Sequence, residues 1–188
     1  MNTKLKKLIF SALLLSLGLI LPFFTAQIPE IGNMLLPMHL PVLFCGLLCG
    51  PLYGGAVGFI TPLLRSLLFG MPVLYPNAVG MAFELMTYGA VIGLLYALFR
   101  KKNLLSVYLS LVPAMLAGRI VWGIAQTVLL NFQGKSFALA VFWANGFANA
   151  IPGIVLQLIL IPFSMVMIQK FQQKTLLNIL EVYQQARE

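Results

Sequence analysis

The side chains best suited to chemistry in this chain are a few polar residues set at helical spacings within strongly apolar stretches. Members of each group lie three, four or seven residues apart, which places them on one face of a helix. The groups are Arg119, Trp122 and Gln126; Glu84 and Tyr88; and Asn145 and Asn149. They favour binding of a small polar molecule over catalysis, because one histidine, His39, and four acidic residues leave few candidates for acid–base work. We therefore do not expect an enzyme.

Other chemical motifs are weak or absent. The tripeptide 134–136 (GKS) resembles the end of a phosphate-binding loop, but Leu129 stands where that motif needs glycine. Cys45 and Cys49 are one helical turn apart without histidine or carboxylate neighbours, so they suit packing better than metal binding. We expect no metal site and no cofactor bound by this chain.

The composition indicates an integral membrane protein. The chain is 61% hydrophobic and 9% charged, with a mean hydropathy of +0.97, whereas soluble domains average about 25% charged residues. A crossing needs roughly 20 apolar residues, so the pattern predicts an all-α, six-helix transmembrane bundle in a single domain, 1–188. The expected spans are 8–24, 37–50, 52–69, 78–99, 104–130 and 139–169. The second span is short and bounded by proline, so we expect it to be tilted, broken or partly buried in protein.

The basic residues predict the orientation of the chain. Nine lysines and arginines fall in segments that six spans place on one side, against Lys135 alone on the other side. The nine are Lys4, Lys6, Lys7, Arg100, Lys101, Lys102, Lys170, Lys174 and Arg187. This positive-inside pattern predicts cytoplasmic N- and C-termini and argues against nucleic acid as the reason for the net charge of +8. We expect residues 171–188 to form a cytoplasmic helical tail.

With this topology, the candidate polar residues fall at mid-membrane or in its outer half. The outer loops and span ends add Asn33, His39, Arg65 and Tyr75 to the groups above. Ionisable side chains at such depth usually face a bundle interior or a wet cavity, so their convergence predicts an outward-facing pocket. Glu84 can pair with one membrane arginine, and Glu30 lies in a loop. The second arginine then lacks an acidic partner, which favours an anionic ligand.

A purely structural interpretation stays open for each of these residues. Glu84 and Arg119 could pair and lock two helices together, with the two asparagines as interhelical hydrogen bonds. Aromatic residues at this level could line a pocket or form an interfacial belt. We expect the pocket for Trp122 and the belt for Trp143.

Three adjoining segments resemble a known family. Residues 32–43 (GNMLLPMHLPVL), 45–54 (CGLLCGPLYG) and 62–66 (PLLRS) are similar to the S components of energy-coupling factor (ECF) vitamin transporters, closest to the pantothenate-type branch. The resemblance implies a multi-pass protein of a bacterial plasma membrane that binds a vitamin from outside. Such a subunit docks on a transmembrane coupling protein driven by two cytoplasmic ATPases, and those partners use the ATP.

The resemblance also implies roles for particular residues. The first helix would dock through a small-x-x-x-small motif, matched by Ala12 and Ser16 with serine in place of the second alanine. The outer loop 25–36 would act as a lid. For pantothenate, Arg65 or Arg119 would hold the carboxylate, and the hydroxyls and amide would fall to Gln126, Asn145 and Asn149.

Other functions stay open at this stage. The ligand could be another vitamin of the riboflavin, pyridoxine or folate type, or another small polar metabolite. A stand-alone secondary carrier or channel is a second possibility. An intramembrane enzyme that uses Glu84 and His39 is a third and less favoured one.

Overall fold

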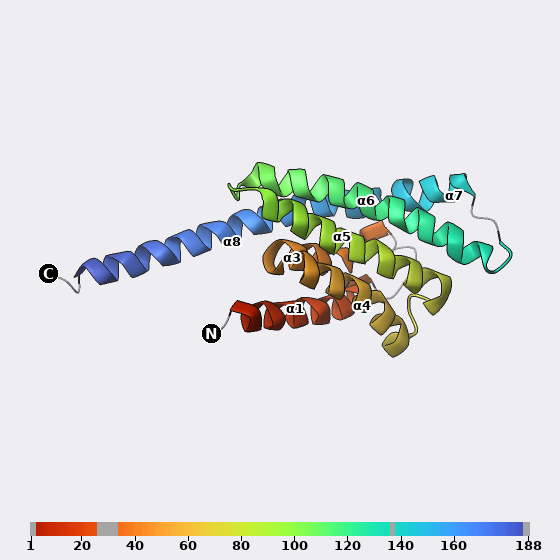
Figure 1. The fold of residues 1–188 in the computed structure, drawn as a ribbon, viewed down its shortest axis with the longest axis horizontal. Coiled ribbons are helices and arrows are strands. Elements are labelled where there is room, and N and C mark those ends of the chain that lie inside the picture. The colour runs from red at the N-terminus through yellow and green to blue at the C-terminus, as the bar shows by residue number, and fades with distance from the viewer. Residues whose placement is uncertain (1–2, 26–33, 136–137, 186–188) are drawn as a thin grey trace.

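The computed structural model describes residues 3–25, 34–135 and 138–185, and every regular element in these ranges is helical (Figure 1). The elements are α1 (Thr3–Ile20), η1 (Leu21–Thr25), α3 (His39–Cys49), α4 (Pro51–Phe69), η2 (Leu74–Ala78), α5 (Val79–Leu98), α6 (Leu104–Asn131), α7 (Leu139–Trp143), η3 (Ala144–Ala148) and α8 (Ile151–Gln185). Asn33 and most of the expected lid, 25–36, lie outside the described residues.

Five helical segments are long and apolar enough to cross a membrane. They are Thr3–Phe24, Pro51–Phe69, Leu74–Leu98, Leu104–Asn131 and Leu139–Phe171. The expected all-helical membrane protein is thus confirmed. The expected second span corresponds to α3, which has 11 residues against the roughly 20 that a full crossing needs. The total of six crossings and the side on which the termini lie stay predictions.

Bare backbone contacts hold α3, α4 and α5 together at the centre of the bundle. A Cβ atom added at Gly58 of α4 would lie 2.2 Å from the carbonyl oxygen of Leu85 on α5. A Cβ atom at Gly89 of α5 would lie 2.2 Å from the carbonyl oxygen of Gly54, and one at Gly46 of α3 would lie 2.5 Å from that of Gly89. These distances are shorter than any Cβ contact allows, so glycine is required for the close approach.

Connections between the helices use residues suited to tight turns. Gly50, with φ of 99°, separates α3 from α4, and Pro51 begins α4 at a position where a missing N–H is harmless. Asn103 begins α6 with a capping box: its side chain accepts from the Ser106 amide, and the Ser106 hydroxyl accepts from the Asn103 amide. These short turns keep successive helices adjacent and fix their relative positions.

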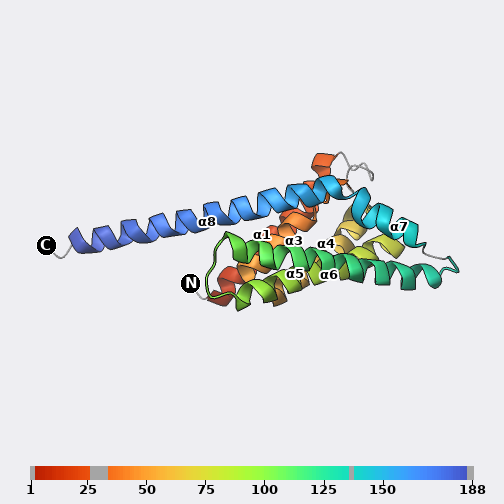
Figure 2. The same ribbon diagram turned by 90° about the horizontal axis from the view of Figure 1, so that it is seen from above.

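The expected last span, 139–169, is divided in the structure. Helix α7 and the π-helical η3 end in a turn at residues 149–150, and α8 starts at Ile151. Pro152 explains the division, because it has no N–H to donate to the carbonyl of Ala148 and its ring would collide with that group. Helix α8 then runs on to Gln185 and extends past the other helices (Figure 1, Figure 2).

Candidate functional site

A buried carboxylate on α5 forms the centre of the polar site. One oxygen of Glu84, Oε1, lies 2.8 Å from Nη1 of Arg119 on α6 and 3.4 Å from Nε2 of His39 at the start of α3. Glu84, Arg119 and His39 are 1%, 4% and 1% exposed. Three helices therefore each supply one ionisable side chain to a site closed to solvent.

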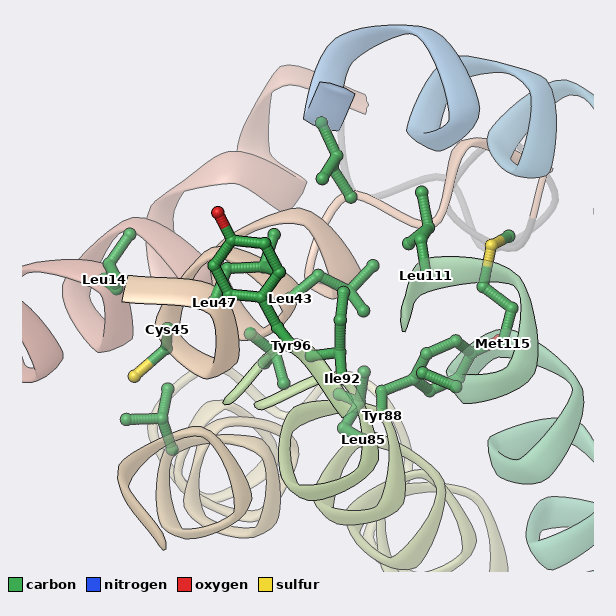
Figure 3. Close-up of a cluster of buried hydrophobic side chains, with 14 of the residues drawn as sticks. Leu14, Leu43, Cys45, Leu47, Leu85, Tyr88, Ile92, Tyr96, Leu111 and Met115 are labelled. Atoms are coloured by element: carbon green, nitrogen blue, oxygen red, sulfur yellow. The ribbon is translucent and has the colours of Figure 1, made fainter. Parts of the chain in front are cut away.

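The packing of α5 explains why these groups meet. Gly118 precedes Arg119, and a Cβ atom at this glycine would lie 2.6 Å from the ring of Tyr88, so α6 comes close to α5 here. The ring of His39 meets the same tyrosine edge to face, with 5.1 Å between centroids. Tyr88 thus forms one wall of the site. In Figure 3 it lies beside Met115, within the cluster of buried hydrophobic side chains.

The Glu84–Arg119 pair agrees with the structural alternative considered above, but it leaves hydrogen-bonding groups unused. A guanidinium has five N–H donors, and the Nε and Nη2 atoms of Arg119 are buried without a hydrogen bond of normal geometry. The Tyr88 hydroxyl, which lies beside Arg119, and Nδ1 of His39, which lies beside the Leu36 backbone, also lack one. Buried polar atoms are usually satisfied, and each one that is not requires an explanation. A negatively charged ligand would accept hydrogen bonds from these arginine donors.

Arg65, the other arginine predicted to bind an anion, makes different contacts. Its Nη1 atom donates to the carbonyl of Leu19 at 2.5 Å, and its guanidinium lies 4.9 Å and 5.5 Å from the ring centroids of Phe23 and Phe69. Pro22 cannot donate to that carbonyl in the 3-10 turn that ends the first helix. Arg65 supplies the missing donor and joins the end of α1 to the end of α4.

Three predicted residues on or near the C-terminal half of α6 also have defined partners. The hydroxyl of Tyr75 donates to the carbonyl of Leu129 at 2.5 Å, which holds η2 against α6. Trp122 stacks on Phe142 of α7, with 6.2 Å between the ring centroids. Gln126 is buried over Gly80 of α5, where a Cβ atom would lie 2.7 Å from its Nε2. Each of these contacts ties α6 to a neighbouring element.

The two asparagines of the last span lie at the surface. Asn149 donates through Nδ2 to Oδ1 of Asn145 at 3.0 Å, and both residues are exposed. The structure therefore brings together four of the predicted site residues: His39, Glu84, Tyr88 and Arg119. No described contact joins Arg65, Tyr75 or the asparagine pair to this group.

One buried amide without hydrogen-bond partners was not predicted from the sequence. Gln157 of α8 is 0% exposed, and neither its Oε1 nor its Nε2 has a hydrogen-bond partner. Its signal in the sequence is weak, because the positions three and four residues away on either side hold only glycine, isoleucine and leucine. Gly153, one helical turn before Gln157, is the residue that indicates a close contact between helices near this position.

In the described part of the chain, no three histidine, cysteine or acidic side chains come together to form a metal site. Cys45 and Cys49 are buried and unbonded to each other, and the Cys45 thiol lies 3.5 Å from the Ser11 hydroxyl. A helical membrane protein with a buried cluster of charged and polar groups is typical of a subunit that binds or transports small molecules.

Comparison with known proteins agrees with this class. A family model described as ECF transporter, substrate-specific component, matches residues 6–168. The chain belongs to this family, so the resemblance to ECF S components is confirmed. The family consists of substrate-binding components of transporters and is not an enzyme family. No curated protein and no solved structure was found to match the chain.

Proposed function

We propose that this chain captures pantothenate from outside a bacterial cell and that Arg119 binds its carboxylate. The observation that carries the proposal is the unequal use of the Arg119 guanidinium. Nη1 donates to Glu84, while Nε and Nη2 are buried and make no hydrogen bond of normal geometry, although the Tyr88 hydroxyl lies nearby. A carboxylate needs two adjacent N–H donors for bidentate binding, and these two atoms supply them.

Glu84 has a supporting role in this proposal. It balances the charge of Arg119 and fixes the direction of the guanidinium. When Nε2 of His39 carries the proton, it donates to the same carboxylate and helps to hold it in place. The predicted neutral contacts, Gln126, Asn145 and Asn149, stay candidates for the outer part of the path.

The transport step belongs to partners in this proposal. The chain docks on a transmembrane coupling protein, two cytoplasmic ATPases use the ATP, and this chain binds no cofactor. Ser11, Leu14 and Gly18 of α1 are buried, while Ala12 and Ser16 are exposed on another face of that helix. Small exposed residues four apart allow a second helix to approach closely, which supports this face as the docking surface.

The orientation proposed above completes the topology. Both termini and the helical tail lie in the cytoplasm, because the basic residues gather in segments on that side. The N-terminal end of α1 and the C-terminal part of α8 point to the same end of the structure (Figure 1, Figure 2). This arrangement supports an even number of crossings in the plasma membrane.

The proposal is tested by ligand identification and titration. Mass spectrometry of small molecules that copurify with the protein should find pantothenate, and calorimetry should show that it binds. Arg119→Ala should weaken binding by about 2 kcal/mol or more, roughly 30-fold in Kd. The double variant Arg119→Ala/Glu84→Gln serves as a second test, because it removes both charges and leaves no unpaired ion in the core.

Other results would lead to different conclusions. Binding of riboflavin, pyridoxine or folate in place of pantothenate would overturn the ligand assignment and keep the capture role. Uptake into liposomes that contain only this chain would overturn the partner-dependent mechanism in favour of a stand-alone secondary carrier. Unchanged affinity in both variants would show that Arg119 is structural.

A further inference from the structure

Gln157 is the most deeply buried amide side chain without a role in the site described so far. It is 0% exposed, and both polar atoms of its amide lack partners. Gln169 on the same helix is different, because its Nε2 donates to the Tyr96 hydroxyl at 3.2 Å. A buried amide left without partners lowers stability, so its presence requires an explanation that the fold does not give.

The exposure pattern of α8 shows that Gln157 faces the bundle. Buried residues of this helix and the preceding turn recur every three or four positions: Ala150, Gly153, Gln157, Ile161 and Met165. Residues between them are exposed: Ile151, Val155, Ile159 and Phe163. This is the one-sided pattern of a helix packed on one face. Gln157 therefore points to the side on which α8 packs against α6 and α3.

A backbone contact joins the start of α8 to the segment before α3. A Cβ atom at Gly153 would lie 2.6 Å from the carbonyl oxygen of Met34 and 2.8 Å from the carbonyl carbon of Leu35. From this contact α8 and α3 run in the same direction (Figure 1). A hydrogen bond further along α8 relates Gln157 to the polar site. Nε2 of Gln169 donates to the Tyr96 hydroxyl of α5 at 3.2 Å, and α5 runs in the same direction as α8 (Figure 1). Gln157 is twelve residues before Gln169, and Glu84 is twelve residues before Tyr96, which is about 18 Å along each helix, so Gln157 and Glu84 lie at a similar depth.

We propose that Gln157 is a further ligand-binding residue and recognises a neutral amide or hydroxyl group next to the anionic group held by Arg119. This inference rests on the proposed function. An amide offers both a donor and an acceptor, and so matches a group that has both in the ligand. In this proposal the unbonded amide of Gln157 on α8 and the unbonded donors of Arg119 on α6 bind neighbouring groups of one ligand.

The binding test uses two probes that differ in one group. Pantothenate carries the carboxylate, and pantothenol has an alcohol in its place while the amide and the other hydroxyls are the same. Gln157→Met keeps the approximate volume and removes both polar atoms. By calorimetry in detergent, it should weaken both probes at least tenfold, because a ligand group is left unpaired. Arg119→Ala/Glu84→Gln should weaken pantothenate and leave pantothenol within about twofold.

Gln169→Met is the matched control, since it changes the same residue type on the same helix at a site with its own partner. It should bind both probes like the unaltered protein. If Gln157→Met also binds both probes like the unaltered protein, Gln157 is a structural residue satisfied by internal water, and the inference is overturned. A loss confined to pantothenate would also overturn it, because a neutral contact is predicted to affect both probes.

A second measurement does not depend on the identity of the ligand. In ligand-free protein, Gln157→Met should leave the unfolding temperature unchanged or raise it, because an unsatisfied buried amide is removed. A fall in this temperature would show that the amide stabilises the empty fold, and the inference would fail. If the unaltered protein does not bind pantothenate, the proposed ligand fails, while the unfolding temperature still decides on Gln157.

Discussion

Replacement of Arg65 by alanine separates two explanations of a buried arginine: ligand binding and support of a helix end. The side chain is 2% exposed, donates to the Leu19 carbonyl at 2.5 Å and lies over two phenylalanine rings. A hydrogen bond from a charged donor contributes about 1.5–3 kcal/mol. Each cation–π contact adds about 0.5–1 kcal/mol at exposed sites and more when desolvated. Relief of charge burial offsets part of this sum, so we expect a net loss of about 2 kcal/mol.

The assay pairs unfolding with ligand titration. Arg65→Ala should lower the free energy of unfolding in mixed micelles and leave ligand affinity within about twofold of the unaltered protein. Arg65→Lys should have a smaller effect on unfolding, because it keeps a donor but loses the planar group that stacks on Phe23 and Phe69. Arg100→Ala, at an exposed position, is the control and should change neither quantity.

The reasoning would be refuted by the opposite pattern. A tenfold loss of affinity for an anionic ligand, with the free energy of unfolding unchanged, would place Arg65 in the binding site. The sequence alone allowed either Arg65 or Arg119 to hold the carboxylate. If Arg65→Ala lowers both stability and ligand affinity, the variant Phe69→Leu separates the two explanations. This variant removes a stacking ring without touching the charge, so it should lower stability by about 0.5–1 kcal/mol and keep affinity.

Further outcomes follow from close contacts and charges. Gly58→Ala should lower stability by about 1–3 kcal/mol, because its Cβ would lie 2.2 Å from a backbone carbonyl, whereas Gly55→Ala meets nothing closer than 3.5 Å and should be neutral in the same melts. Glu84→Gln should destabilise the ligand-free protein by about 3 kcal/mol in thermal unfolding, because it leaves Arg119 as a buried cation without its partner. Ala12→Trp should abolish copurification with a coupling protein and keep ligand affinity, whereas loss of both would indicate misfolding.

The features that depend on composition and periodicity were predictable from the sequence. Low charge and high hydropathy identified a helical membrane protein, because few alternatives satisfy backbone groups in lipid. The spacing of Glu84 and Tyr88 placed both on one face of α5, and the structure has both in the polar site. The sequence left open whether Glu84 pairs with Arg119, and the ion pair at 2.8 Å answers that question.

The contacts of Arg65 were not predictable in this way. Its type and depth matched an anion site, but its partner is a main-chain carbonyl exposed by the way the first helix ends at Pro22. Backbone acceptors of this kind leave no mark in the side-chain pattern. The asparagine pair was harder to predict for a similar reason: Asn145 and Asn149 lie in the segment that departs from regular α-helix before Pro152.

Gln157 shows a third limit of sequence reasoning. Repeated polar residues at helical spacing mark a functional face in the sequence, whereas Gln157 has only apolar residues and glycine three and four positions away. Its burial depends on which face of α8 meets the bundle, and that face is set by Gly153 against Met34 and Leu35. The contact joins residues more than a hundred positions apart in the chain, so no local pattern contains it.

The glycine contacts among α3, α4 and α5 restrict how the protein can move. Where helices meet through side chains, rotamer changes let the helices slide past each other in small steps. Where backbone meets backbone, as at Gly46, Gly54, Gly58 and Gly89, there are no rotamers to change. These three helices should therefore move as one rigid body. A rearrangement that releases a bound molecule must then be carried by α1, α6 and α8, two of which supply Arg119 and Gln157.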